Sequence, residues 1–138
     1  MSIVQTQTTS FKKELYQAIH DLSTDTIKIA LYTANADLNE DTTVYSTTNQ
    51  VVASGYTAGG EIMTGVAISS SGYVAYANWN NVSWTAALTA RCALIYNASK
   101  GNKSIAVLDF GSDKTSTTTF TITMPANTST TALIRSSN

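Results

Sequence analysis

The sequence predicts an all-β protein: an antiparallel two-sheet sandwich, jelly-roll-like, with one short N-terminal amphipathic helix and an extended N-terminal arm. Apolar and polar residues alternate through most of the chain after residue 26, only one segment has helical spacing, and short turn-rich segments separate the alternating runs. A chain of 138 residues can bury one core without disulfides or metals. We expect a single domain, 1–138, with the arm at 1–9, the helix at 10–22 and the sandwich at 26–136.

The arm and the helix come first in the chain. Residues 1–9 are polar and β-prone and have no partner nearby in the sequence, which favours an extended arm. In the following segment the apolar residues draw one stripe along a helical cylinder, and Ser10 can cap its N-terminus. The stripe consists of Phe11, Leu15, Ala18, Ile19 and Leu22. Because three turns are marginally stable alone, the helix should pack on the sheet.

Five segments alternate with period two and therefore predict strands. In 26–33, Ile27, Ile29 and Leu31 share one face, and Lys28, Ala30 and Tyr32 share the other. The same alternation recurs in 72–79, 89–97, 104–111 and 117–124. Turn-rich connections, which favour antiparallel hairpins between neighbouring strands, stand before Tyr73, Lys103, Thr117 and Thr131.

The longest stretch without firm periodicity is 34–60. Loops of that length are usually either mobile or functional. A phosphate-binding loop would need a following helix and a nearby lysine, but the next segment reads as extended and no lysine lies between Lys28 and Arg91. We therefore expect positive φ angles, where the loop rejoins the sandwich, at Gly55, Gly59 and Gly60.

Charge limits the classes of partner. The net charge is −1 and the basic residues are scattered, so no nucleic acid is expected as a partner. Only 12% of the residues are charged, about half the usual share, and such a surface loses little when it is desolvated. This composition favours proteins packed against other subunits, with an ordinary uncharged β-protein surface as the alternative. No membrane helix and no signal peptide are evident, so we expect synthesis in the cytosol.

The sequence contains no evident catalytic constellation. His20, the only histidine, would need an orienting partner and a nucleophile to act as a base, and an imidazole at a helix end is the simpler interpretation. Cys92 lies in an apolar run and should be a buried thiol, and Asp109 should meet a polar partner. One histidine and one cysteine cannot complete a zinc site, and 37–41 lacks the glycine and glutamate of a calcium loop. We expect no enzyme, no cofactor and no metal.

Three ordered blocks, 20–33 (HDLSTDTIKIALYT), 45–60 (YSTTNQVVASGYTAGG) and 90–116 (ARCALIYNASKGNKSIAVLDFGSDKTS), resemble a known family. It comprises small virion structural proteins encoded in the morphogenesis modules of tailed bacteriophages. Within that group the chain is most similar to the capsid cement, or head-decoration, proteins of short-tailed phages. The resemblance runs from Phe11 to Ile134, and it implies a β-sandwich, often a jelly roll, on the outside of an icosahedral capsid.

The resemblance also implies a mechanism and partners. The chain would bind the outside of the mature shell and stabilise it through contacts that bridge subunits, after assembly in the host cytoplasm. Its partners would be the major capsid protein and further copies of itself, as a homodimer in preference to a homotrimer. The arm would pair with a neighbouring subunit as an added strand. The expected interface residues are Ile3, Val4, Gln5, Thr6, Phe11, Leu38, Val44, Tyr45, Val51 and Tyr56.

A phage tail, neck or fibre component is the alternative. Such a protein would bind a host surface or other virion parts, and it would need an exposed groove. The aromatic residues available for that groove are Tyr45, Tyr56, Trp79 and Trp84. Copy number separates the two hypotheses, because decoration requires hundreds of copies per particle and a tail or neck part far fewer. A phage enzyme acting on cell wall or capsule is a third hypothesis, disfavoured by the missing catalytic groups.

Overall fold

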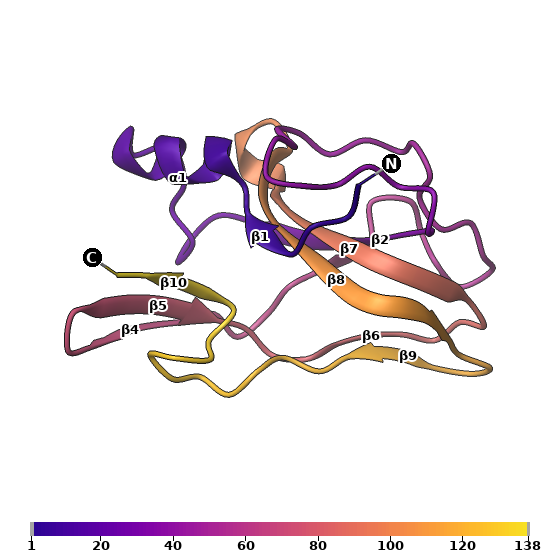
Figure 1. The fold of residues 1–138 in the computed structure, drawn as a ribbon. Coiled ribbons are helices and arrows are strands. Elements are labelled where there is room, and N and C mark those ends of the chain that lie inside the picture. Colours follow the sequence, from indigo (N-terminus) through magenta and orange to yellow (C-terminus); the bar gives the residue numbers. More distant parts are fainter. Residues whose placement is uncertain (1, 138) are drawn as a thin grey trace.

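The chain folds into three antiparallel β-sheets accompanied by one short α-helix, as seen in a computed structural model that describes residues 2–137 (Figure 1). This confirms the all-β class. The elements in chain order are β1 (Thr6–Gln7), α1 (Thr9–Tyr16), β2 (Ile27–Tyr32), β3 (Glu61–Ile62), β4 (Ala67–Ser71), β5 (Val74–Asn78), β6 (Val82–Trp84), β7 (Thr89–Asn97), the 3-10 helix η1 (Ala98–Lys100), β8 (Lys103–Thr115), β9 (Phe120–Ile122) and β10 (Ile134–Ser136).

The largest sheet has five strands in the order β1-β8-β7-β2-β3, and every neighbouring pair is antiparallel. Its centre is the predicted β7–β8 hairpin, closed by η1 and by Gly101 in the left-handed conformation. β8 continues through 111–115, where a connection was predicted before Thr117. The register shifts between Ala90, which pairs with Lys114, and Cys92, which pairs with Asp109. The extra residues of β8 between these two pairs form a bulge, so the end of β8 still pairs with the start of β7.

The second layer lies below this sheet in Figure 1 and consists of two small sheets, with orders β10-β5-β4 and β6-β9. One opposing sheet was predicted, but the described residues form two. The predicted β4–β5 hairpin is present. β9 and β10, however, pair with β6 and β5 rather than with the strands that precede them in the chain. These two pairings are non-local, so turn signals could not specify them.

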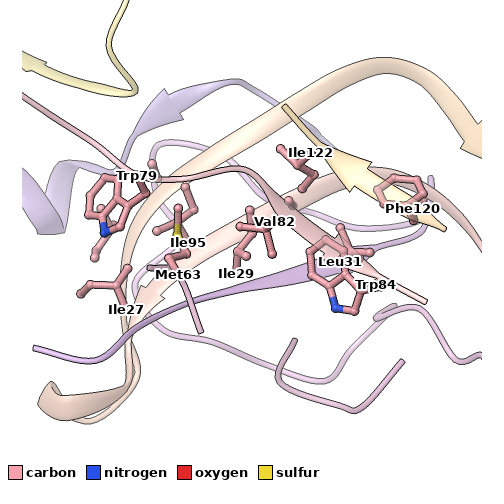
Figure 2. Packing of buried hydrophobic residues seen from close by; sticks show 14 of the residues in the cluster. Ile27, Ile29, Leu31, Met63, Trp79, Val82, Trp84, Ile95, Phe120 and Ile122 are labelled. Carbon is pink, nitrogen blue, oxygen red and sulfur yellow. The ribbon is translucent and has the colours of Figure 1, made fainter. Parts of the chain in front are cut away.

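The main core fills the space between the two layers (Figure 2). Ile27, Ile29 and Leu31 of β2 point into it together, which confirms their predicted common face. From the opposite layer, Trp84 contributes the largest fully buried side chain, with its ring centroid 6.1 Å from that of Phe120. Burying a large apolar side chain contributes about 1.5–3 kcal/mol, so this cluster is the main source of stability.

The opposite face of the five-stranded sheet is also buried. Ala30 and Tyr32 of β2 lie there with Leu94 and Val107, and the side chains that cover them come from the long loop after β2. Leu38 is the largest buried loop residue in this second cluster. The first part of the segment between β2 and β3 thus forms a covering layer although it contains no named helix or strand, and Figure 1 shows it above the sheet. Val51 and Tyr56, from the later part of the segment, belong to the main core.

The glycines of this loop have the positive φ angles that the sequence predicts, which are 90° at Gly55, 100° at Gly59 and 79° at Gly60. Gly60 also makes a close approach to the sheet, since a Cβ built on it would lie 1.8 Å from the carbonyl oxygen of Ile29. A side chain is therefore excluded there by contact with β2. These glycines shape the return of the loop, and they do not form a phosphate site.

Helix α1 is shorter than the predicted 10–22, and its N-cap is Thr8 rather than Ser10. The Thr8 hydroxyl accepts a hydrogen bond from the Phe11 N–H at 3.3 Å. At the other end, the Ala18 N–H donates to the Leu15 carbonyl and the Ile19 N–H donates to the Glu14 carbonyl. These two bonds form a Schellman motif that ends the helix, with Ala18 at φ 57° in the position usually occupied by glycine.

Replacing this alanine with glycine should stabilise the fold. Ala18→Gly removes the cost of a Cβ in the left-handed region, about 1–2 kcal/mol, while the greater freedom of glycine in the unfolded chain returns part of that. We expect the free energy of unfolding to rise by about 0.5–1 kcal/mol, measured by urea denaturation. Ala87→Gly is the matched control, since Ala87 is exposed with no positive φ, and it should destabilise the protein. A loss of stability in Ala18→Gly would contradict this account.

Candidate interaction surface

The N-terminal arm lies on its own chain. Thr6 and Gln7 pair with Val107 and Ala106 at the edge of β8, and the Val4 N–H donates to the Leu38 carbonyl at 3.0 Å. The prediction that residues 1–9 extend from the body and add a strand to a neighbour is therefore corrected for the described residues 2–9. The strand addition takes place within the chain, because the free edge of β8 is the nearest available partner; Met1 lies outside the described residues.

Four of the predicted interface residues belong to the interior. Phe11 is fully buried under the helix, Val51 and Tyr56 belong to the main core, and Leu38 belongs to the second cluster. The Tyr56 hydroxyl donates to the Gln50 side-chain carbonyl at 2.7 Å and accepts from the Leu31 N–H at 2.9 Å. These side chains have almost no surface left to give to a partner, so they are removed from the proposed interface.

The other predicted interface residues remain at least partly accessible. Val44 is 48% exposed in the loop. Tyr45 stacks on Tyr96 with ring centroids 4.6 Å apart, so its ring serves the covering layer. The other four residues belong to the N-terminal arm, which runs beside β8 and beside Leu38 of the long loop. They are Ile3, Val4, Gln5 and Thr6.

The aromatic groove considered for a fibre or neck protein is absent from this structure. Tyr56, Trp79 and Trp84 are all buried in the main core. Tyr45, the fourth residue, lies on the far face of the five-stranded sheet with the second cluster. Because the sheet separates it from the other three, the four rings cannot form one binding face.

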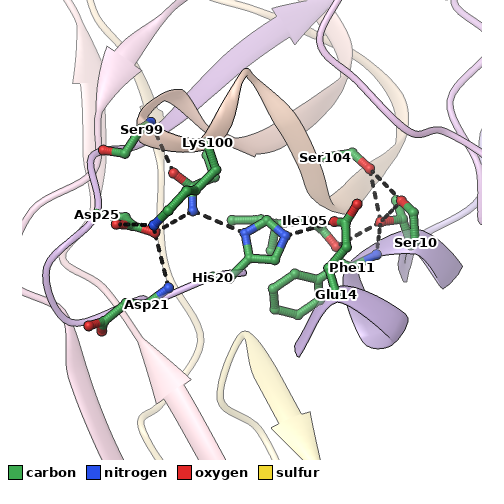
Figure 3. Close-up of polar contacts among 12 residues, drawn as sticks. Ser10, Phe11, Glu14, His20, Asp21, Asp25, Ser99, Lys100, Ser104 and Ile105 are labelled. Carbon is green, nitrogen blue, oxygen red and sulfur yellow. Dashed lines mark hydrogen bonds and ion pairs between the residues drawn. The ribbon is translucent and has the colours of Figure 1, made fainter. Parts of the chain in front are cut away.

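His20 lies in a polar network that ties the end of α1 to the sheet (Figure 3). The Asn97 side-chain nitrogen donates to His20 Nδ1 at 3.0 Å and to Asp25 Oδ2 at 2.8 Å. Since Nδ1 accepts, the ring proton stands on Nε2, which donates to Glu14 at 2.8 Å. Lys100 completes the network with an ion pair to Asp25 at 2.9 Å. The contacts of the imidazole, with Glu14, Asn97 and the Phe11 ring, tie the end of α1 to β7.

Cys92 and Asp109 occupy the environments that the sequence predicts. Cys92 is buried in the second cluster, and burial, the largest effect, raises the pKa of its thiol to about 12. Such a thiol is a packing residue. Asp109 forms an ion pair with Arg91 on the neighbouring strand and accepts a hydrogen bond from the Gly111 N–H at 2.8 Å.

A metal centre is not identified within residues 2–137, where His, Cys, Asp and Glu side chains do not gather in threes. The acidic loop 37–41 is held by local hydrogen bonds instead. Asp37 Oδ1 accepts from the Asn39 side chain at 3.1 Å, and the Asn39 oxygen accepts from the Asp41 N–H at 2.9 Å. These oxygens therefore organise the turn itself.

The feature that stands out is a layer without charge. Residues 62–90 and 115–134 contain no Asp, Glu, Lys or Arg, and they supply β4, β5, β6 and β9. We call these four strands the uncharged layer. The charged residues belong instead to the helix, the connection between α1 and β2, the long loop, the five-stranded sheet, η1 and β10. The two sides of the molecule therefore differ in the cost of removing water from them.

The outward face of the uncharged layer is built by alternation. In β9, Phe120 and Ile122 are buried while Thr121 is exposed, and in β6 Ser83 is the exposed residue. The Ser83 and Thr121 hydroxyls lie 2.9 Å apart and form a hydrogen bond across the two strands. All five residues of β4 are exposed. The layer thus presents small hydroxyl and methyl groups that are cheap to desolvate.

Sequence reasoning missed this surface, although a signal for it was present. The signal is the distribution of the charges along the chain: two long uncharged runs are separated by the charged β7–β8 region. The runs alone could not show that they fold side by side, because β6 and β9 are paired only in the tertiary structure.

Comparisons with known proteins give no identification. No protein-family model matches the chain, and no match is found among the curated proteins or the solved structures. Among residues 2–137, no helix has the length and hydrophobicity needed to cross a bilayer.

The Asp25 network should make the fold sensitive to acid. Partial burial raises the pKa of Asp25, but hydrogen bonds from Asn97 and Lys100 outweigh this effect and lower the pKa from 3.8 to about 2. The stabilisation from the carboxylate is therefore complete above about pH 4 and is lost as the pH falls through about 2. Asp25→Asn should lower the free energy of unfolding by about 1–3 kcal/mol near neutral pH. It should also make the free energy of unfolding less dependent on pH between about 4 and 2.

The measurement is guanidinium unfolding at several pH values, followed by tryptophan fluorescence. Asp113→Asn is the matched control, because it removes an exposed carboxylate at the open end of β8 and should leave the profile close to that of the unaltered protein. An equally steep acid dependence in Asp25→Asn would show that other groups are responsible.

Proposed function

We propose that the chain is a virion structural protein of a tailed bacteriophage that decorates the outside of the mature capsid and acts by adhesion alone. Two lines support the proposal. The first is the resemblance of 20–33, 45–60 and 90–116 to phage cement proteins. The second, which carries the structural part, is the uncharged layer, because a decorating subunit must bury much of its surface against a shell.

The physical advantage of the uncharged layer lies in desolvation. Burying an ion that finds no partner costs several kcal/mol, whereas a hydroxyl such as Thr121 already has a hydrogen-bonding neighbour in Ser83. A face of this kind can meet a flat protein surface without matched charges. A contact of roughly 1,500 Å² would suffice for firm attachment.

Stabilisation of the shell would follow from mass action. A protein that binds the mature lattice and not its precursor favours the mature form by about RT ln(1 + [L]/Kd) at each site. Many sites on one particle multiply this effect. No catalytic step is needed, and the proposal contains none; the partners are the major capsid protein and other copies of the chain.

The structure changes which residues the proposal uses. The shell contact moves from the arm and the long loop to the outward face of β4, β6 and β9, because the arm and loop are occupied within the chain. The proposal keeps the jelly-roll-like sandwich as its description of the fold. What supports it is that antiparallel layers enclose one core, although the lower layer is divided.

Antibody labelling of phage particles in negative stain is the direct test. We expect label on the head and hundreds of copies of the chain per particle, with particles stripped of it losing resistance to heat. Label confined to the tail or neck, with few copies, would overturn the capsid assignment in favour of a tail component. Turnover of host envelope polysaccharide by the purified protein would overturn adhesion as the whole function.

Binding of purified protein to stripped shells tests the surface itself. Thr121→Lys places a charge in the middle of β9 on the exposed face of the uncharged layer, and we expect it to weaken binding about tenfold or more, because the ion must be desolvated. Gln17→Lys adds the same charge at the exposed end of α1 and is the matched control. Equal binding by both variants would show that the uncharged layer is not the contact.

A further inference from the structure

The outer strand of the uncharged layer, β4, has an open edge. It lies at the end of the sheet β10-β5-β4, and all five of its residues are exposed. Apart from its ladder with β5, no backbone or side-chain hydrogen bond of residues 67–71 is found within the described part of the chain. Ile68 is 55% exposed on this strand, and Tyr73 in the adjoining turn is 92% exposed.

The turn determines which backbone groups of β4 point outward. Ser71 pairs with Val74, so the loop has two residues, and Gly72 has φ 60° while Tyr73 has no positive φ. This is the pattern of a type II′ turn, which closes on a hydrogen-bonded pair. Because hydrogen-bonded and non-hydrogen-bonded pairs alternate, the N–H and C=O groups of Ile68 and Ser70 face away from β5.

This edge lacks the usual protection against pairing. Proteins blunt edge strands with lysine, proline, bulges or very short strands. Residues 67–71 contain no charged residue and no proline, and the register with β5 is unbroken. Among the described strands, the other sheet ends are elements of two or three residues. The part of β8 that β1 leaves uncovered, 108–115, carries Asp109, Asp113 and Lys114, so β4 is the longest open edge without charge.

We propose that β4 pairs with β4 of a second copy of the chain, antiparallel across a twofold axis, to form one continuous sheet through two subunits. The geometry favours a second copy because the edge is complementary to itself. With Ser69 opposite Ser69 of the other copy, the outward-facing Ile68 and Ser70 fall opposite each other, and every residue of β4 is paired. Neither side brings a charge, and serine and alanine leave the backbones free to approach.

This inference rests on the proposed function, which it deepens by naming the contact between copies. It can nevertheless fail by itself, since dimerisation is measured on the isolated protein without any particle. A dimer joined at β4 would present two copies of the β6–β9 surface and could bridge two positions on a shell. Once the first copy is bound, the second is held near its own site at a high effective concentration, so the dimer binds more tightly than a single copy.

Charge reversal at the central pair tests the register. In an antiparallel pair without hydrogen bonds, the opposed Cα atoms lie about 4.5 Å apart, so like charges there repel strongly. We expect the full-length protein to sediment as a dimer at high concentration. Ser69→Lys and Ser69→Glu should each raise the dimer Kd about tenfold or more, and an equal mixture of the two should restore association.

Ala87→Lys is the matched control, because it adds the same charge to an exposed site in the connection between β6 and β7, away from the β4 edge, and it should leave the dimer Kd unchanged. Circular dichroism will show whether the Ser69 variants keep the fold. A protein that stays monomeric at all concentrations would overturn the proposal. So would a dimer that the Ser69 variants leave intact, or a mixture of the two charge variants that fails to associate.

Cross-linking provides a measurement that does not depend on charge. Ser69→Cys would place two thiols across the axis at a Cα separation within the range of disulfides, and Cys92 does not compete because it is buried. Mild oxidation should give a covalent dimer for Ser69→Cys and none for Ala87→Cys. Equal yields from both variants would show that collisions, and not β4 pairing, bring the chains together.

Discussion

Burial of both faces of the five-stranded sheet is the constraint on which the rest of the structure depends. β2, β7 and β8 carry apolar side chains on both sides, so one covering layer would leave Tyr32, Leu94 and Val107 in water. The two small sheets cover one face, together with Val51 and Tyr56 from the later part of the loop between β2 and β3. The first part of that loop covers the other face. A long loop without regular structure is therefore retained as part of the core, and not as a free appendage.

This constraint also separates the charges. The charged side of the molecule holds the polar networks, such as the one in which Asn97 of β7 joins His20 to Asp25 in the connection between α1 and β2. The uncharged layer packs on the core by alternation, with Phe120 and Ile122 pointing inward, and its polar contacts are between neutral groups such as Ser83 and Thr121. Its outward face is consequently free of the paired charges that would oppose desolvation. Adhesion through that face is a consequence of how the layers are divided.

The location of function moves accordingly. A polar arm and a long loop suggested the surface that meets a partner, but both are used to complete the sheet of their own chain. A segment that seems free to bind a partner can instead be buried when the chain folds, because an unpaired strand edge such as that of β8 pairs with the nearest compatible segment. The edge that remains open, β4, lies on the opposite side of the molecule.

Local chemistry determined β2, β5, β7, β8 and β9, the alternating faces of β2 and β9, the β4–β5 and β7–β8 hairpins, the positive φ at Gly60 and the buried state of Cys92, because each depends on neighbouring residues. The tertiary structure alone decided the pairing of β6 with β9, the end of α1 at Ala18 and the burial of Leu38 and Tyr56. It also brought the two uncharged runs into one face. These features depend on contacts between residues far apart in the chain, where the free energy of packing, and not any local pattern, selects the partner.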